Sequence, residues 1–425
     1  MRRDVTSPPG NIEQPPESSF APSRQGSRLQ DALISALAQK AQTHTRRFPR
    51  AMQRSREGLA LQGRTLVDLS SNDYLGLSQH PLLRERAASW AARFGTGAGA
   101  SRLVTGTLEL HLALEEKLAR FKNCEAALLF ATGWQANASI LPALDQLSRL
   151  QTGHEARMFC DRLNHASLHH GCAAAGVHQK RFRHNDLGHL RQLLEQHTSH
   201  GGLSFIVTES VFSMDGDRAD LAGLRALADE FGAFLYVDEA HATGILGPGG
   251  TGLAGALADL AVHTASKALG GMGAFVCGSS ALCAWLFNQA SGLVYSTALP
   301  PTVLGAMDAA LELVPHMERE RQHVARLAAD LRRVLEQRGF GAGPSTTQIV
   351  PLIIGENATA LALAEKLEKA GFLAMPIRPP TVPHGTARLR FSLHAGLREE
   401  QLEALVSCLP SGPFGRQDPG LAKRV

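Results

Sequence analysis

The sequence predicts an α/β fold, in which a mostly parallel central sheet is flanked by helices and followed by a smaller α+β C-terminal domain. Apolar segments such as 204–208 and 234–237 alternate with amphipathic helical segments such as Leu221–Phe231, and strands that alternate with helices pair in parallel through right-handed crossovers. Past residue 279 the character changes to long charged helical segments and strands of alternating polarity. With 425 residues, the chain is long enough for both domains.

Composition narrows the classes of function. The chain has 44% hydrophobic and 19% charged residues and a formal net charge of +4, which is too mild for a face that binds nucleic acid. No uncharged apolar run approaches the ~20 residues that a membrane span requires. The six cysteines form no C-x-x-C pair, so we expect reduced thiols and a location in the cytoplasm.

The two ends of the chain differ from the rest. Residues 1–27 are rich in Pro, Ser, Gly and Gln and lack an apolar core, which is typical of a disordered extension and not of a secretory signal. The predicted organisation, in chain order, is a disordered extension over 1–27, an N-terminal helix and arm over 28–74, a large α/β domain over 75–302, an α+β domain over 303–410 and a flexible tail over 411–425.

The strands and helices follow from the spacing of apolar residues. The predicted strands of the first part of the chain lie at 66–69, 126–130, 158–161, 204–208, 234–237 and 261–264. The predicted helices there lie at 29–43, after Pro81, at 109–121, after Thr132 and at Leu221–Phe231. Beyond them we expect helices at 281–292, 303–339 and 358–370, and strands at 348–354, 372–375 and 387–393.

Two segments resemble motifs that they do not satisfy. The glycine-rich run 95–102 (GTGAGASR) is not preceded by an apolar strand, so a loop near a ligand is a better interpretation than a dinucleotide fingerprint. The run 164–172 (NHASLHHGC) is dense in His and Cys, but its spacing fits no standard zinc pattern. We therefore expect no metal.

Polar side chains and glycines follow several of the predicted strands. Ligands of parallel sheets bind at the carboxyl ends of the strands. The residues that fall there are Gly133, His165, Ser213, Asp238, His241 and Lys267. Their convergence on one edge is the main functional signal in the residues themselves.

Lys267 and Asp238 have the chemistry that pyridoxal phosphate (PLP) requires. A lysine can hold PLP as a Schiff base and move protons as the free amine, and a carboxylate stabilises the protonated ring nitrogen. Thr264 and Ser266 flank the lysine and supply hydroxyls for the phosphate. Singly, a lysine near glycines or an aspartate at a strand end is more often structural. Together, within an α/β pattern, they favour a PLP site, which His241 would contact.

The C-terminal part offers one further candidate. In the strand 387–393, Arg388 and Arg390 point to the same side because side chains alternate along a strand. One of them could hold a carboxylate in bidentate fashion, although such arginines are usually surface residues.

Five segments are similar to the α-oxoamine synthases of PLP fold type I. They are 71–76 (SNDYLG), 161–167 (DRLNHAS), 208–217 (TESVFSMDGD), 237–241 (VDEAH) and the region around Lys267. The resemblance covers the chain from about residue 29 to 409. Within the family, the segment 377–390 (IRPPTVPHGTARLR) is similar to the branch that forms 8-amino-7-oxononanoate in biotin biosynthesis.

The resemblance implies a PLP-dependent acyltransferase. It would condense L-alanine with a pimeloyl thioester, carried by acyl carrier protein or coenzyme A, with release of CO2 and the free thiol. Lys267 would carry the cofactor and transfer protons, Asp238 would pair with the pyridinium, and His241 would contact the phenolic oxygen. The resemblance also implies that His165 stacks on the cofactor ring and positions the substrate. The cofactor pocket would include Gly133, Trp134, Ser213 and Thr264, with Glu209 close by. Arg390 would hold the amino-acid carboxylate, Thr381 would contact substrate, and Asn72 would lie at the active-site entrance. A homodimer is implied as well.

The sequence departs from the family at three places. Trp134 stands where Phe, Tyr or His is more common, the segment 264–271 (TASKALGG) differs from the commoner T-F-G-K-A form, and the family's N-terminal substrate arginine falls near Thr45, beside Arg46. A related enzyme that uses glycine or serine is an alternative. So is a non-catalytic PLP-binding or scaffold subunit, against which the intact Lys267, Asp238 and His165 argue.

Overall fold

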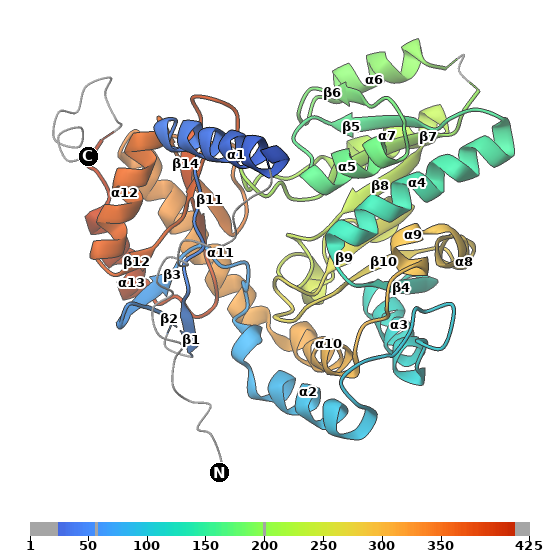
Figure 1. Ribbon diagram of the computed structural model, residues 1–425, viewed down its shortest axis with the longest axis horizontal. Helices are drawn as coiled ribbons and strands as arrows, with labels where there is room; N and C mark the ends of the chain where they lie inside the picture. Colours follow the sequence, from blue (N-terminus) through green and yellow to red (C-terminus); the bar gives the residue numbers. More distant parts are fainter. Residues whose placement is uncertain (1–23, 56–57, 199–200, 413–425) are drawn as a thin grey trace. The chain divides into compact units, whose positions relative to one another are not determined.

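The computed structural model describes residues 24–55, 58–198 and 201–412 of the chain (Figure 1). The chain divides into two compact units, Met1–Arg50 and Ala51–Val425. The first contains helix α1 (Arg24–Gln42), whose Leu29, Leu33 and Leu37 side chains are exposed. The predicted helix at 29–43 is therefore present but begins at Arg24, within the extension predicted over 1–27. The rest of that extension and most of the predicted tail lie outside the described residues.

A seven-stranded sheet forms the centre of the second unit. Its strands are β4 (Ala126–Phe130), β10 (Ala274–Gly278), β9 (Leu260–Thr264), β8 (Phe234–Asp238), β7 (Ser204–Glu209), β5 (Arg157–Asp161) and β6 (Lys180–Phe182), in that spatial order. β10 is antiparallel to both of its neighbours, and the pairings from β9 to β6 are parallel. The prediction of a mostly parallel sheet is confirmed.

Helices cover both faces of this sheet, as Figure 1 shows. On one face, Met158, Val207 and Tyr236 pack with residues of α4 (Gly133–Thr152), α5 (Ala166–Ala174) and α8 (Ser280–Gln289). On the other face, Ile206 and Leu235 pack against α6 (Leu187–Gln196) and α7 (Leu221–Phe231). Because successive side chains of a strand point to opposite faces, a strand buried on both sides is apolar throughout. That is why these strands were visible in the sequence.

The C-terminal part contains two smaller sheets. One joins β1 (Gln53–Ser55), β2 (Gly58–Leu61), β3 (Arg64–Asp68) and β12 (Phe372–Leu373), and the other joins β11 (Ile349–Gly355), β14 (Ala387–Ser392) and β13 (Pro376–Ile377). The helices of this region are α11 (Glu318–Gln337), α12 (Asn357–Lys369) and α13 (Glu399–Cys408). The other helices of the unit are α2 (Pro81–Phe94), α3 (Glu109–Lys122), α9 (Ser291–Val294) and α10 (Pro301–Leu313).

One buried cluster of apolar side chains includes Leu69 and Phe275 together with Phe391 and Leu405. This core therefore joins residues from both of the predicted domains, and 51–425 is compact as one unit. The division at residue 303 stays a prediction. None of the helices in the described ranges has the length and apolar composition needed to cross a bilayer.

Some predicted elements have different bounds in the structure. The helical region predicted over 303–339 is interrupted by a short 3-10 turn, Val314–His316, because Pro315 lacks the backbone N–H that a continuous helix needs. The helix predicted over 281–292 ends at Gln289, and α9 follows it. Elements β1, β2, β6, β10, α5, α6 and α13 were not predicted from the sequence. Of the four strands among these, β1, β2 and β6 have four residues or fewer.

Candidate active site

The carboxyl ends of the parallel strands place the predicted site residues. Asp238 is the last residue of β8, and Lys267 follows β9 by three positions. His165 and Ser213 follow β5 and β7, and Gly133 begins α4 directly after β4. The antiparallel β10 begins at the same edge, where the Gly273 carbonyl accepts a hydrogen bond from the Thr264 hydroxyl (3.1 Å). A single edge of the sheet thus gathers side chains that are far apart in sequence.

Lys267 lies on a turn that packs against the segment preceding α2. Gly270 has φ of 68°, and a Cβ there would lie 2.5 Å from the backbone of Leu77 and Ser78. Only glycine fits both the left-handed conformation and this close approach. Gly270 therefore serves the packing of the Lys267 turn against Leu77 and Ser78.

The Lys267 amine is held in a buried environment. Its Nζ lies 3.0 Å from His241 Nε2. Burial lowers the pKa of Lys267, and the positive charge of Arg390 acts in the same direction. The Asp238 and Glu209 carboxylates oppose this shift, and the resulting pKa is about 8. An amine with this pKa is present in both protonation states near neutral pH, which suits proton transfer.

Asp238 is buried and held by neutral donors. Its Oδ2 accepts a hydrogen bond from Asn137 Nδ2 (2.7 Å), and its Oδ1 accepts one from the Ala240 N–H (2.9 Å). Asn137 is itself oriented by the Tyr236 hydroxyl (2.7 Å) and donates to Ser167 Oγ (2.9 Å). No cation within the described ranges forms an ion pair with Asp238, so its carboxylate is available to a cationic ligand group.

Glu209 lies beside the same groups. It accepts a hydrogen bond from the His165 backbone N–H. Burial raises its pKa well above the usual range, and the Asp238 charge raises it further. A negative charge on Glu209 is therefore disfavoured beside Asp238.

A chain of hydrogen bonds links Lys267 to the C-terminal part. His241 Nδ1 lies 2.7 Å from the Tyr74 hydroxyl, which donates to Asn72 Oδ1 (3.1 Å) and accepts from Arg390 (3.2 Å). Burial lowers the pKa of His241 well below its usual value, and the positive charges of Lys267 and Arg390 reinforce that shift. His241 is therefore a neutral imidazole that connects the lysine with the Tyr74 and Arg390 region.

The N-terminus of α4 and the turn after β9 form a candidate anion site. A Cβ on Gly133 would lie 4.0 Å from the Thr264 side chain, so the first turn of the helix is next to this hydroxyl. The Thr264 and Ser266 hydroxyls are 2.7 Å apart. Thr132 caps the Gln135 N–H (3.0 Å). Within the described residues the N–H groups of Gly133 and Trp134 have no partner, as is usual in a first helical turn, and such groups bind phosphate.

His165 and Trp134 lie together at the carboxyl-end edge of the sheet. Their rings meet edge to face, with centroids 6.0 Å apart, and Trp134 also packs on His170 at 5.4 Å. His165 Nδ1 lies 2.7 Å from Ser167 Oγ, and burial lowers the His165 pKa. The Trp134 side chain is 47% exposed, so it is free to contact a ligand.

The two arginines of β14 differ in their partners. Arg388 forms an ion pair with Asp215. Arg390 donates only to neutral acceptors, which are the Ser213 carbonyl, Ser392 Oγ, Asn72 Oδ1 and the Tyr74 hydroxyl. Arg390 is 7% exposed and forms no ion pair in the part of the chain that the structure describes. Of the two, Arg390 is therefore the one whose charge is available to a carboxylate.

One expected contact is not brought into this arrangement. Thr381 is exposed on the loop between β13 and β14, where its N–H donates to the Arg378 carbonyl. In contrast, the sequence analysis assigned no role to Asn137, Tyr74 or Gln348, which donates to the His241 carbonyl (2.8 Å). Asn137 lies one helical turn after Gly133, and this spacing could have placed it on the same face of α4 as Gly133.

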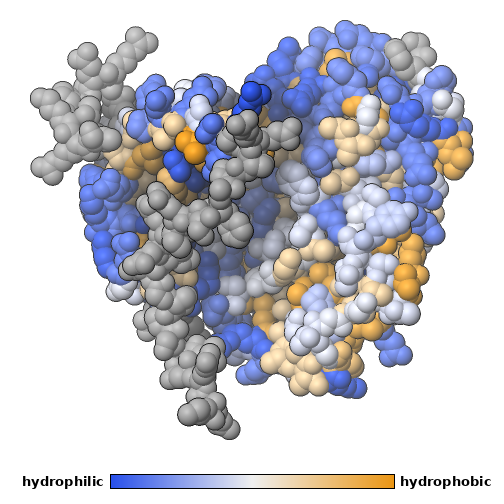
Figure 2. Space-filling view, viewed as in Figure 1, coloured by the Kyte–Doolittle hydropathy of each residue, from blue (hydrophilic) through white to orange (hydrophobic). Residues whose placement is uncertain are grey.

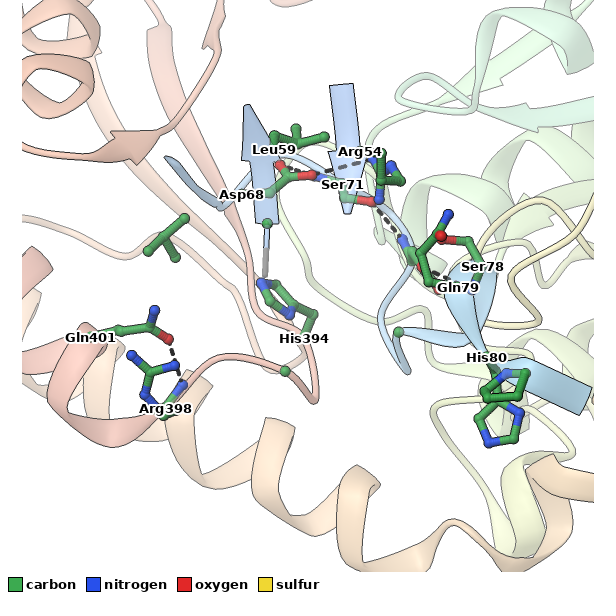
Figure 3. A pocket seen from close by; sticks show the side chains of 16 residues that line it. Arg54, Leu59, Asp68, Ser71, Ser78, Gln79, His80, His394, Arg398 and Gln401 are labelled. Carbon is green, nitrogen blue, oxygen red and sulfur yellow. Dashed lines mark hydrogen bonds and ion pairs between the residues drawn. The ribbon is translucent and has the colours of Figure 1, made fainter. Parts of the chain in front are cut away.

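A cavity of about 380 Å³ lies next to this site, and Figure 3 shows the side chains that line it. Its lining includes Asp68, Ser71, Asp73, His394 and Arg398, and none of the predicted site residues. Asn72 lies between Ser71 and Asp73 in the sequence, and Tyr74 follows Asp73. Both contact Arg390 instead. The turn 71–74 therefore separates this cavity from the candidate site.

The donor set fits PLP. The buried amine suits the aldehyde of that cofactor, and the buried carboxylate without a cationic partner suits its pyridine nitrogen. The imidazole 3.0 Å from the amine suits the phenolic oxygen, and the helix N-terminus beside two hydroxyls suits the phosphate. Arg390 adds a site for an anionic group of a second ligand.

Comparisons with known proteins point the same way. A family model described as "Aminotransferase class I and II" matches residues 64–409. An 8-amino-7-oxononanoate synthase from Gluconacetobacter diazotrophicus is 61% identical over 350 residues, which are 82% of this chain and 88% of that protein.

Solved structures are similar along most of the chain. A serine palmitoyltransferase with its PLP internal aldimine has a TM-score of 0.81 at 26% identity, covering 90% of this chain and 96% of that one. An 8-amino-7-oxononanoate synthase from Francisella tularensis has a TM-score of 0.68 at 27% identity, covering 81% of this chain and 96% of that one.

Proposed function

We propose a reaction for this chain on the basis of its family. The chain belongs to the class I and II aminotransferase family and, within it, to the 8-amino-7-oxononanoate synthases. It is a PLP-dependent acyltransferase of biotin biosynthesis, acting on an amino acid and an acyl thioester. We propose that the amino acid is L-alanine and that the thioester is pimeloyl-acyl carrier protein or pimeloyl-coenzyme A. The products are then 8-amino-7-oxononanoate, CO2 and the free thiol.

The observation that carries this proposal is the meeting of Lys267, Asp238 and Arg390 at one edge of the sheet. When bound, PLP supplies an electron sink that stabilises negative charge on the α-carbon of an amino acid. Asp238 holds the ring nitrogen of the cofactor in its protonated form, because a buried carboxylate favours a cation next to it. Asn137 and the Ala240 N–H fix the direction of that carboxylate.

Lys267 and His165 are the proposed catalytic residues. As the free amine, Lys267 Nζ accepts the α-proton of alanine and later returns a proton to the product, and its lowered pKa suits both steps. His165, edge-on to Trp134, covers the cofactor ring and positions the substrate. Gly133, Trp134, Thr264 and, from the opposite loop, Ser213 complete the proposed cofactor pocket.

Arg390 is proposed to hold the alanine carboxylate, with Asn72 at the entrance and Thr381 in contact with substrate. A guanidinium without an acidic partner binds a carboxylate without first breaking an ion pair. Its neutral partners Ser213, Asn72 and Tyr74 orient it. Exposed Thr381 lies on a loop, so its proposed contact requires the loop to approach the site.

The serine-using alternative is favoured by one observation. The TM-score to a serine palmitoyltransferase, 0.81, exceeds the 0.68 to the synthase from Francisella tularensis. The 61% identity to a protein named 8-amino-7-oxononanoate synthase outweighs it, because both structures are only 26–27% identical to this chain. We therefore keep alanine as the proposed amino acid.

The test is a product assay with purified protein and PLP. Pimeloyl-coenzyme A and pimeloyl-acyl carrier protein are each combined with L-alanine, glycine or L-serine, and products are identified by mass spectrometry. We expect 8-amino-7-oxononanoate with one CO2 per product, formed fastest from alanine. A faster reaction with glycine or serine contradicts the proposed substrate. Bound PLP without any product supports the non-catalytic alternative instead.

Arg390→Lys is expected to raise the KM for alanine on the order of 10-fold to 100-fold, because a lysine cannot form the bidentate contact. The effect on the KM for the thioester is expected to be small. Steady-state kinetics with each substrate varied separately measures both values. The matched control is Arg388→Lys, since Arg388 is already paired with Asp215 on the same strand. An equal rise in the alanine KM for both variants would contradict the role of Arg390.

The rate at which apo-protein takes up PLP is expected to rise with pH, with a midpoint near the Lys267 pKa of about 8, and to level off above that midpoint. Only a neutral amine attacks the cofactor aldehyde, and the lowered pKa of Lys267 means that its neutral form dominates above that pH. The growth of the visible absorption band between pH 6.5 and 10 measures the rate. Free Nα-acetyllysine in the same buffers corrects for the titration of PLP itself. A midpoint near the usual lysine value of 10.5 would contradict the buried site.

We also propose that the protein is a homodimer in the cytoplasm. Figure 2 shows apolar residues gathered over the region of α2, α3 and α10, where Phe94, Leu103, Val104 and Leu112 are exposed. Large exposed apolar patches are typical of subunit interfaces. The six cysteines are free thiols, four of them buried, which supports a reducing compartment.

A further inference from the structure

His184 bridges two buried carboxylates outside the cofactor site. Its Nδ1 lies 2.9 Å from Asp161 Oδ1, and its Nε2 lies 2.8 Å from Asp217 Oδ2. The ring packs edge to face on Phe212, with centroids 4.4 Å apart. Asp161 is fully buried and the Asp217 side chain is 5% exposed. Both ring nitrogens of His184 are therefore used by acidic partners.

The neighbouring Asn185 reinforces the bridge. Its backbone φ is 53°, a left-handed conformation that asparagine tolerates. In this conformation the Asn185 N–H donates to Asp161 Oδ2 (2.9 Å) and its Nδ2 donates to Asp217 Oδ2 (2.8 Å). One two-residue turn thus donates to both carboxylates.

Two carboxylates this close to one imidazole favour a cation between them. Two buried carboxylates that share one partner repel each other unless a positive charge lies between them. Asp161 and Asp217 are the charged groups that face His184 in the described structure, and no lysine or arginine there pairs with either. Burial opposes a charge on the imidazole, but the hydrogen bonds and charges of the two aspartates outweigh burial and raise the pKa of His184 to about 9.

The two aspartates belong to the loops that carry proposed site residues. Asp161 ends β5 and accepts from the Leu163 N–H (2.8 Å), so it shapes the turn that leads to His165. The Asp217 carbonyl accepts from the Phe212 N–H (3.0 Å), which closes the loop that contains Ser213. The Ser213 carbonyl accepts from Arg390 at the other side of this loop.

We propose that His184, as an imidazolium between Asp161 and Asp217, is a positioning residue that holds the loops of His165 and Ser213 in the arrangement the reaction requires. This inference rests on the proposed function, because it assigns His165 and Arg390 to that reaction. His184 itself contacts neither the candidate cofactor pocket nor Arg390.

The first test is the protonation state of His184 in the wild-type holoenzyme. In protein labelled with 15N at histidine, we expect one imidazolium, with both ring nitrogens protonated, to persist above pH 8 and to titrate near pH 9. This signal is expected to be absent from His184→Gln. A spectrum in which no histidine remains protonated at pH 8 overturns the proposal. The wild-type measurement is decisive even if the variant does not fold, and it needs no substrate.

The second test is kinetic. We expect His184→Gln to bind PLP while its kcat falls on the order of 10-fold to 100-fold, as for a small misplacement of catalytic groups. His178→Gln, at an exposed histidine, is the matched control and is expected to have wild-type kcat. Asp217→Asn/His184→Gln is expected to lose less activity than the product of the two single losses, since Asp161 then has no second carboxylate beside it that a cation must offset. A wild-type kcat in His184→Gln, or independent losses in the double variant, overturns the proposal.

Stability gives a third measurement. Because the pKa of His184 is raised by folding, its contribution is fully present below about pH 6.5 and is lost as pH rises through about 9. The difference in Tm between wild type and His184→Gln is therefore expected to be largest below pH 6.5 and to shrink toward pH 9. A difference independent of pH contradicts the imidazolium. If the protein fails to make 8-amino-7-oxononanoate but shows these two pH-dependent signatures, the proposed function fails and the bridge stands.

Discussion

Lys267→Ala is expected to abolish the condensation, with kcat/KM at least about 1,000-fold lower than wild type. The substitution removes the amine that both holds the cofactor and transfers the α-proton, and proton transfer alone is worth on the order of 10²–10⁴ in rate. Lys267 is the amine that lies between Asp238, Glu209 and His241 at the edge of the sheet. The product assay with alanine and the pimeloyl thioester measures the loss.

Two controls separate this result from a loss of folding. Lys369→Ala removes a lysine that is 71% exposed and is expected to leave activity unchanged. In Lys267→Ala itself, PLP is expected to bind without its covalent link, so dialysis removes it while the protein keeps its circular dichroism spectrum. A Lys267→Ala protein with wild-type condensation activity would refute the mechanism.

Asp238→Asn is expected to lower kcat/KM roughly 100-fold to 1,000-fold, the usual cost of removing one electrostatic stabiliser from a buried site. The amide keeps the shape of the side chain but carries no charge, so the ring nitrogen of the cofactor loses the group that keeps it protonated. PLP is expected to remain attached to Lys267. Steady-state kinetics and the visible spectrum of the same preparation report the two effects separately.

Asp229→Asn is the matched control, because the Asp229 side chain is 68% exposed on α7. It is expected to have the kinetics of the wild type. If Asp238→Asn has them too, the carboxylate does not act on the cofactor. If instead Asp238→Asn no longer retains PLP covalently, its role is in binding and not in charge stabilisation, which also contradicts the assignment.

The site at the carboxyl ends of the strands could be predicted because each strand end can be recognised from residues that are neighbours in the sequence. Strands β7 and β8 are buried on both faces, and their apolar runs 205–207 and 234–237 end in polar residues, so their carboxyl ends are visible in the sequence. Asp238 and Lys267 follow such ends. The carboxyl-end rule then places them together without any knowledge of their contacts.

The partners of these residues could not be predicted, since each comes from a distant part of the chain. Asn137 reaches Asp238 across 101 positions, and Arg390 reaches Asn72 across 318. The strand pattern by itself did not separate Arg388 from Arg390 either, because both point to the same side of β14, and only the family resemblance singled out Arg390. In the structure, the ion pair of Arg388 with Asp215 distinguishes them. His184 gave no signal at all, as its neighbours in sequence do not include either of its carboxylates.

The most direct measurement of the central claim is to identify the lysine that holds PLP. The holoenzyme is reduced with borohydride, which fixes the cofactor to its amine, and peptides are then analysed by mass spectrometry. The account predicts one modified peptide, containing Lys267. Modification of another lysine, or recovery of all PLP unattached, would contradict the site on which the proposed reaction depends.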